Sequence, residues 1–219
     1  MKQKLKSGFI RRHLDEESIE KYEHMLQKRE ESAESLKSSM INHLSALNDG
    51  VIAIFITVMM LEIPYPVDCA DYGSFGWSVL VFLVSFFIIA DFWYENKKVF
   101  EAIREADHLV IVANFLFLAS LALIPVDTKW VMNVTNVYAA ENFGLNYLIS
   151  TLLLQFLYYA AVRKRFVNHM KLFFVMMVAR VGFLLIVNAV LIVLSYFLPK
   201  WGILLYIILP IISFFRPKE

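Results

Sequence analysis

A small set of polar and charged side chains interrupts the apolar stretches of this sequence, and their types define the chemistry that is available. Such groups are costly in apolar surroundings, so they are usually paired, packed for a specific contact or used to handle an ion or a proton. Three acids and one arginine among them suit ion pairing, cation attraction or proton relay. The set is Asp49, Thr57, Glu62, Asp91, Asn114, Arg180 and Asn188.

The familiar catalytic motifs are absent from the sequence. There is no glycine-rich phosphate loop, no HExxH, no GxSxG elbow and no paired His or Cys at metal-ligand spacing. The five histidines are scattered, and for His43 and His108, near the ends of apolar stretches, a structural hydrogen bond is the commoner role. The single Cys69 excludes an intrachain disulfide. We therefore expect no enzyme, no cofactor and no resident metal, and nothing predicts a nucleic-acid partner.

The elements that carry these residues are predicted to be membrane helices. The chain has 219 residues, of which 59% are hydrophobic, and its mean hydropathy of +0.59 exceeds that of soluble domains. A helix needs about 20 apolar residues to cross about 30 Å of hydrocarbon. Six runs approach this length, namely 44–63, 75–94, 109–126, 142–162, 172–198 and 201–215. We therefore predict an all-α, polytopic membrane protein with six transmembrane helices per chain.

The placement of basic residues predicts the orientation of these helices. The formal net charge is only +1, but cytoplasmic loops are rich in Lys and Arg and exported loops are poor in them. Lys129 and Lys200 lie on one side and Arg180 lies within the fifth run, while all the other Lys and Arg residues fall on the opposite side. We predict a multi-pass protein of the cell membrane with both termini in the cytoplasm.

The N-terminal segment differs in composition from the rest of the chain. Its beginning is basic, and residues 15–37 mix both signs of charge with Ile19, Tyr22, Leu26 and Ala33 at helical spacing. We predict a charged, helical cytoplasmic segment at 1–43, a transmembrane domain at 44–216 and a cytoplasmic tail at 217–219. The segment is either a solvated helix or a contact with anionic lipid or with neighbouring subunits.

The first apolar run has two different faces. At 100° per residue, Ile54, Thr57 and Leu61 fall within about 60° of one another, whereas Asp49 lies roughly 140° from Ile54. A stripe of this composition fits ordinary packing against lipid or another helix. It becomes a functional surface if identical stripes form a ring around an axis.

Two intramembrane charges of opposite sign suggest a pair. Asp49 and Arg180 are predicted to lie at comparable depth from the cytoplasmic side, and an unpaired charge there would be expensive. We hypothesise that they pair directly or through Asn114 or His108.

Two motifs carry a family resemblance that extends over residues 43–215. The first, NDGVIAIFITVMMLEI at 48–63, resembles the first-helix signature of the transmembrane protein 175 potassium channels, R-x-x-x-F-S-D-G followed by an apolar helix ending in L-E-I. The second combines FWYENKKVF at 92–100 with NFLFLASLALIPVDT at 114–128 and is similar to the family's second and third helices. The matching residues are Asp49, Gly50, Leu61, Glu62, Ile63, Trp93, Asn114, Phe115, Leu116 and Pro125. His43, Leu47 and Asn48 replace the family's Arg, Phe and Ser.

The resemblance implies a potassium-permeable cation channel in which the first helix lines the pore. Ile54 would form a hydrophobic constriction, with further layers at Thr57 and Leu61, and the sequence contains no TVGYG filter. Glu62 would lie at the outer mouth, although it could also simply reach the interface. The polar network of the family motif would comprise His43, Asn48, Asp49, Asn114 and Arg180.

The resemblance also implies an assembly. One chain offers one such helix, so closure around an axis needs a cyclic homo-oligomer, and the family's single-repeat bacterial members are tetramers. The expected partners are three further copies of the chain and the lipid bilayer, with potassium as the permeant ion.

Two other classes of function stay open at this stage. A secondary transporter or proton-conducting protein could use Asp49, Asp91 or Arg180 as a titrating relay, although the sequence shows no inverted repeat. A non-conducting scaffold could recruit partners through residues 1–43.

Overall fold

The computed structural model describes residues 16–103, 107–163 and 170–214. The predicted tail at 217–219 and residues 1–15 of the N-terminal segment lie outside this range. Within it the chain forms helices and no strands, so the predicted all-α fold is confirmed. The elements are α2 (Glu16–Leu61), the 3-10 turn η1 (Cys69–Asp71), α3 (Tyr72–Ala102), α4 (His108–Leu121), α5 (Ile124–Asn133), α6 (Val137–Val162), α7 (Met170–Phe197), α8 (Pro199–Leu205) and α9 (Ile208–Phe214).

Most of these elements are long and apolar enough to cross a membrane. Five helical stretches among the described residues meet that condition, and Pro199–Ile211 forms a shorter apolar helical region. The five are Glu20–Leu61, Cys69–Ala102, His108–Asn133, Val137–Val162 and Met177–Phe197. The chain is a multi-pass membrane protein, and each of the first five predicted spans overlaps one of these stretches.

Two prolines divide predicted spans into shorter helices. Proline has no N–H to donate to the carbonyl four residues earlier. Before Pro125 the backbone tightens, with Leu123 N donating to Ser120 O at 3.2 Å, and the third span becomes α4 followed by α5. Before Pro210, Leu209 N likewise donates to Tyr206 O at 3.3 Å, which separates α8 from α9.

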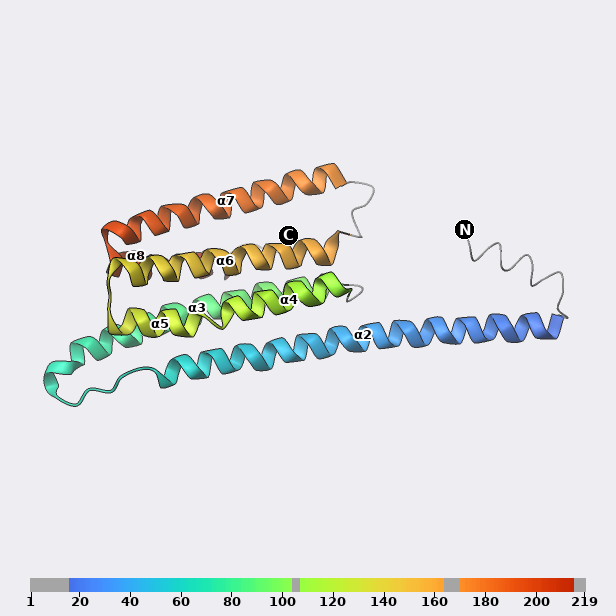
Figure 1. Cartoon of the computed structure of the whole chain (residues 1–219), viewed down its shortest axis with the longest axis horizontal. Helices are drawn as coiled ribbons and strands as arrows, with labels where there is room; N and C mark the ends of the chain where they lie inside the picture. Colours follow the sequence, from blue (N-terminus) through green and yellow to red (C-terminus); the bar gives the residue numbers. More distant parts are fainter. Residues whose placement is uncertain (1–15, 104–106, 164–169, 215–219) are drawn as a thin grey trace.

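Helix α2 is much longer than the first predicted span. It continues from Glu16 to Leu61 without a break, so the described part of the N-terminal segment, residues 16–43, and the first span up to Leu61 are one helix. Figure 1 shows the second half of α2 lying along the other helices, while its first half projects beyond them. The division of the chain at residue 43 therefore stays a prediction, with no change of backbone structure to mark it.

The bundle is built around α6. This helix packs against α4, α5, α7 and α8, while α2 packs against α3, α4 and α5. Aromatic rings join the layers, with the centroid of Tyr147 on α6 lying 5.3 Å from those of both Phe92 and Tyr206. In Figure 1, α7 and α2 lie on opposite sides of the bundle.

Candidate functional site

Helix α2 has one face that is buried in its own subunit. Asn48, Ile52 and Met59 are 1%, 2% and 0% exposed, and they follow one another at helical spacing. They contact the neighbouring helices of the same chain. For example, the Met59 sulfur accepts a hydrogen bond from Thr128 Oγ1 on α5, with the two atoms 3.6 Å apart. This face fixes the rotation of α2 about its own axis.

The predicted stripe lies on a different face of α2 and is exposed. Ile54 is 58% exposed and Leu61 is 84% exposed, and Thr57 is exposed between them. One turn earlier, a Cβ added to Gly50 would meet no described atom within 4 Å. No described part of the same chain covers this stripe, so it is free to face lipid, water or another subunit.

The hydroxyl of Thr57 has a defined orientation. Thr57 Oγ1 donates its hydrogen to the carbonyl of Ile54, one turn earlier, at 2.9 Å. Because the hydrogen is used within the helix, the oxygen lone pairs are left for whatever occupies the exposed face. The stripe therefore offers one oxygen acceptor between two branched apolar side chains.

A cluster of three buried asparagines joins α2 to α3 and α4. Asn48 Nδ2 donates to Asn96 Oδ1 at 2.9 Å and to Asn114 Oδ1 at 2.8 Å, and Asn114 Nδ2 donates back to Asn48 Oδ1 at 2.9 Å. All three residues are at most 1% exposed. Two of the residues predicted for the polar network, Asn48 and Asn114, are thus brought together, and Asn96 completes the cluster.

The hypothesis that Asp49 pairs with Arg180 is wrong for the chain as folded. Asp49 Oδ2 lies 2.6 Å from Lys97 Nζ, and Asp49 Oδ1 accepts the indole N–H of Trp93 at 2.8 Å. Lys97 also donates to Ser45 Oγ at 2.9 Å. The acid therefore joins α2 to α3, and not to the third and fifth spans as the hypothesis required.

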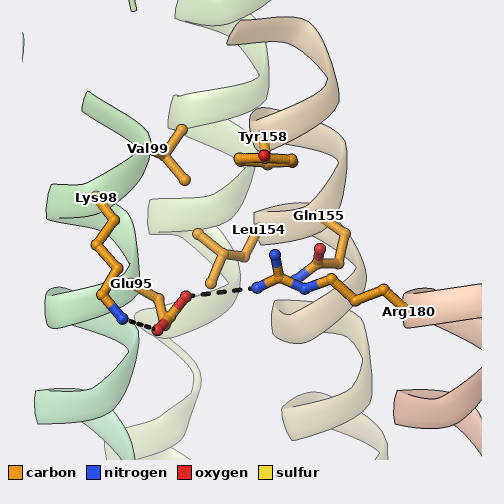
Figure 2. Close-up of a pocket in the computed structure, with 7 residues that line it drawn as sticks. All are labelled: Glu95, Lys98, Val99, Leu154, Gln155, Tyr158 and Arg180. Carbon is orange, nitrogen blue, oxygen red and sulfur yellow. Dashed lines mark hydrogen bonds and ion pairs between the residues drawn. The ribbon is translucent and has the colours of Figure 1, made fainter. Parts of the chain in front are cut away.

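Arg180 meets a different acid on the other side of the bundle. Its Nη2 lies 3.5 Å from Glu95 Oε2, and its guanidinium carbon lies 5.6 Å from the centroid of the Tyr158 ring. Figure 2 shows these groups around a pocket between α3, α6 and α7, with Lys98 on the other oxygen of Glu95 at 2.6 Å. The hypothesis placed Asp49 and Arg180 at a common depth, but depth does not specify which helices are neighbours.

The two remaining predicted residues lie near opposite ends of the membrane part of α2. His43 is exposed and lies outside the asparagine cluster. Glu62, just after the end of α2, forms an ion pair with Lys129 of α5 at 2.7 Å. The predicted mouth residue therefore has a cationic partner from its own chain.

Sequence reasoning missed several polar residues that hold the helices together. Trp93 and Lys97 are four residues apart, so one face of α3 presents both donors to Asp49, and this spacing was available as a signal. Buried Asp127 accepts hydrogen bonds from Asn142 Nδ2 and Asn146 Nδ2, both at 2.6 Å. The corresponding signal is the pair of asparagines four residues apart on α6.

The chain is similar to proteins that are described as potassium channels. Residues 43–125 match the family model described as endosomal/lysosomal potassium channel TMEM175. A potassium channel of Chryseobacterium sp. is 30% identical over 91 residues, which are 40% of this chain and 47% of the relative. A potassium channel of Chamaesiphon minutus is 30% identical over 103 residues, which are 43% of this chain and 51% of the relative. The matched region thus spans about half the length of these curated relatives.

One solved structure shares the fold. It is the crystal structure of a lysosomal potassium-selective channel TMEM175 homolog from Chamaesiphon minutus, with a TM-score of 0.66 and 22% identity, and the match covers 81% of this chain and 98% of that one. At this level of identity the match shows the fold alone. Together with the family model, it confirms the resemblance that the two sequence motifs indicated.

Proposed function

We propose that this chain, which carries the TMEM175 family match at residues 43–125, is one subunit of a homotetrameric, potassium-permeable cation channel. The channel lies in the cell membrane, with both termini in the cytoplasm. Its pore is lined by the exposed face of α2, with Ile54 at the constriction and Thr57 and Leu61 as further layers.

The observation that carries this proposal is the division of α2 into a fixed face and a free face. Ile52 and Met59 bury one side of the helix in its own subunit, while Ile54 and Leu61 stay 58% and 84% exposed. A single chain supplies one such face and cannot enclose a pore with it. Closed rotational symmetry would place identical faces around a common axis, which is how one helix per subunit can line a channel.

A ring of isoleucines can control ion passage without a backbone-carbonyl filter. Branched apolar side chains that narrow a pore exclude liquid water, and a slightly wider ring forces a cation to lose part of its hydration shell. Potassium is more weakly hydrated than sodium and should lose less. The free lone pairs of Thr57, whose hydroxyl hydrogen is held by the Ile54 carbonyl, supply oxygen contacts next to the ring.

The polar contacts of α2 to its own subunit support a pore-lining position for the stripe. The asparagine cluster and the Asp49–Lys97 pair tie α2 to α3 and α4 on faces away from the stripe. Of the three residues of the hypothetical relay, Asp49, Asp91 and Arg180, the first and the last have charged partners in the chain, Lys97 and Glu95. These contacts suit a structural role, so a channel is favoured over a titrating transporter.

The proposal is tested by reversal potentials of purified protein in liposomes, with potassium on one side and sodium on the other. The test variant is Ile54→Asn, and Ile186→Asn is the matched control because Ile186 is 67% exposed on α7, a helix outside the proposed pore. We expect a potassium-leaning potential in the wild type and the control. In Ile54→Asn the current should grow or the selectivity should fall. The proposal fails if well-folded oligomers carry no current, or if both variants behave alike.

A further inference from the structure

The projecting half of α2 carries apolar side chains that its own chain leaves exposed. Tyr22 is 37% exposed, Leu36 is 71% exposed and Met40 is 49% exposed. Figure 1 shows that no other labelled helix accompanies this part of α2. Apolar groups that recur along one side of a solvated helix usually mark a contact with another molecule.

These side chains follow a seven-residue repeat. From Tyr22 onward, alternating steps of four and three residues reach an apolar residue at most positions. The complete series through the projecting half is Tyr22, Leu26, Arg29, Ala33, Leu36, Met40, His43 and Leu47. This alternation is the a and d pattern of a coiled coil.

The same series continues into the membrane part of the helix without a change of step. After Leu47 it reaches Gly50, Ile54, Thr57 and Leu61, which are the proposed pore-facing positions. The face of α2 that is buried in its own subunit lies opposite, because Ile52 and Met59 both fall at position f of the repeat. The seam formed by these a and d positions therefore runs without interruption from Tyr22 to Leu61, and its membrane part lies opposite Ile52 and Met59.

We propose that residues 22–47 of α2 form a parallel, in-register coiled coil with the same residues of the other subunits, coaxial with the pore. This inference rests on the proposed function, because the axis that the membrane seam surrounds is the axis of the coiled coil. Helices that meet around that axis inside the membrane leave it parallel and at the same height. The usual ambiguity of register and direction in a coiled coil is thereby removed.

Residues beside the seam suit a bundle of more than two helices. Small side chains occupy the four consecutive g positions from residue 32 to residue 53 and let neighbouring helices approach closely; they are Ser32, Ser39, Ala46 and Ala53. Polar members of the seam, Arg29 and His43, reduce stability but fix the register, as polar core residues do in coiled coils. Because a strict seven-residue repeat drifts by about 20° per heptad on a straight helix, the bundle should supercoil to the left.

Site-specific crosslinking of the full chain tests this arrangement. The single Cys69 is replaced by serine, and one new cysteine is introduced either in the seam, by Leu36→Cys, or at position f, by Ser38→Cys. Identical d positions meet around the axis, whereas f positions point outward. With a short bis-maleimide reagent, which joins two thiols, we expect Leu36→Cys to yield mostly covalent dimers, and Ser38→Cys to stay mostly a single chain.

A second pair of variants tests the contribution of the seam to stability. Leu36→Lys should lower the melting temperature of the oligomer by several degrees, because it gathers like charges in one layer, while Ser38→Lys should leave it unchanged. Equal crosslinking of Leu36→Cys and Ser38→Cys, or equal melting of the two lysine variants, overturns the inference. Binding of this helix to anionic-lipid vesicles in place of crosslinking would also overturn it.

The oligomer and its potassium flux are measured on the same samples, so the two proposals can fail separately. A potassium-conducting tetramer whose Leu36→Cys variant does not crosslink contradicts the coiled coil and leaves the channel standing. A monomer without potassium flux contradicts both.

Discussion

At the scale of single residues, several polar groups within this membrane protein form hydrogen bonds and ion pairs between helices. Asn48 is the clearest case, because its amide makes three hydrogen bonds to Asn96 and Asn114 while being only 1% exposed. An amide side chain carries both donors and acceptors, so three of them can bond to one another without bringing a charge into the membrane, although Asn96 Nδ2 has no hydrogen-bond partner among the described residues. Asp49, by contrast, has a partly exposed side chain and forms an ion pair with Lys97.

Replacement of Asn48 should therefore destabilise the fold. Asn48→Ala removes the donor to Asn96 Oδ1 and to Asn114 Oδ1 and the acceptor for Asn114 Nδ2. Unsatisfied buried polar groups cost about 1–3 kcal/mol. Thermal unfolding in detergent should show a clearly lower midpoint for this variant. Asn42→Ala on the exposed side of the same helix serves as the control and should melt like the wild type. Equal midpoints for the two variants would mean that the asparagine cluster does not hold α2 in place.

At the scale of elements, hydropathy predicted where helices lie but not where they end. The apolar runs coincide with α3, α6 and α7, because length and composition alone decide whether a segment can cross a membrane. The third span divides at Pro125, and α2 extends far beyond the first run. Residues 15–37 mix charged and apolar side chains, so their composition indicates a segment separate from the membrane span. Their apolar residues nevertheless follow a helical spacing, and residues 16–37 belong to the same helix as the span.

The same limit explains which parts of the candidate site were predicted. The stripe of Ile54, Thr57 and Leu61 follows from the period of a single helix, and the structure leaves it exposed on one side of α2. The partner of Asp49 depends on which helix is the neighbour of α2. That information resides in packing between helices, so Lys97 was missed and Arg180 was chosen in its place.

The C-terminal helices α7 and α8 pack closely against each other. A Cβ added to Gly202 on α8 would lie 2.5 Å from the backbone Cα of Ser195 on α7, so the contact cannot relax by moving a side chain alone. Gly202→Ala should destabilise the fold by about 1–3 kcal/mol through overpacking. Gly182→Ala is the control, since a Cβ there meets no described atom within 4 Å, and it should be neutral or slightly stabilising. Thermal melting of both variants compares them, and a stable Gly202→Ala would show that α7 and α8 separate easily.

At the scale of the whole molecule, α2 connects the proposed cytoplasmic seam with the proposed pore. One continuous helix carries the proposed coiled coil, the proposed constriction and, directly after its end, Glu62. Its rotation is fixed by its own subunit through Asn48, Ile52 and Met59, and its free face is completed by other copies in the proposed tetramer. A change in the angle of α2 would therefore move the proposed cytoplasmic seam and the constriction together, which makes the assembly a unit and not a set of independent parts.

The charges at the proposed outer mouth belong to this scale, because they act on ions through the field of all subunits. Glu62 is paired with Lys129 at 2.7 Å, so the pair is nearly neutral, and Glu62→Gln would leave the lysine charge alone near the mouth. A lone positive charge repels cations, and salt screens it, since the Debye length falls from about 30 Å at 0.01 M to about 10 Å at 0.1 M. Single-channel conductance of Glu62→Gln should thus fall below the wild type more strongly in dilute than in concentrated potassium chloride.

Glu62→Gln combined with Lys129→Gln removes both charges and should recover most of the conductance. A loss that is equal at all salt concentrations, or that persists in the double variant, would mean that Glu62 supports the fold at the end of α2 and does not act on the permeant ion.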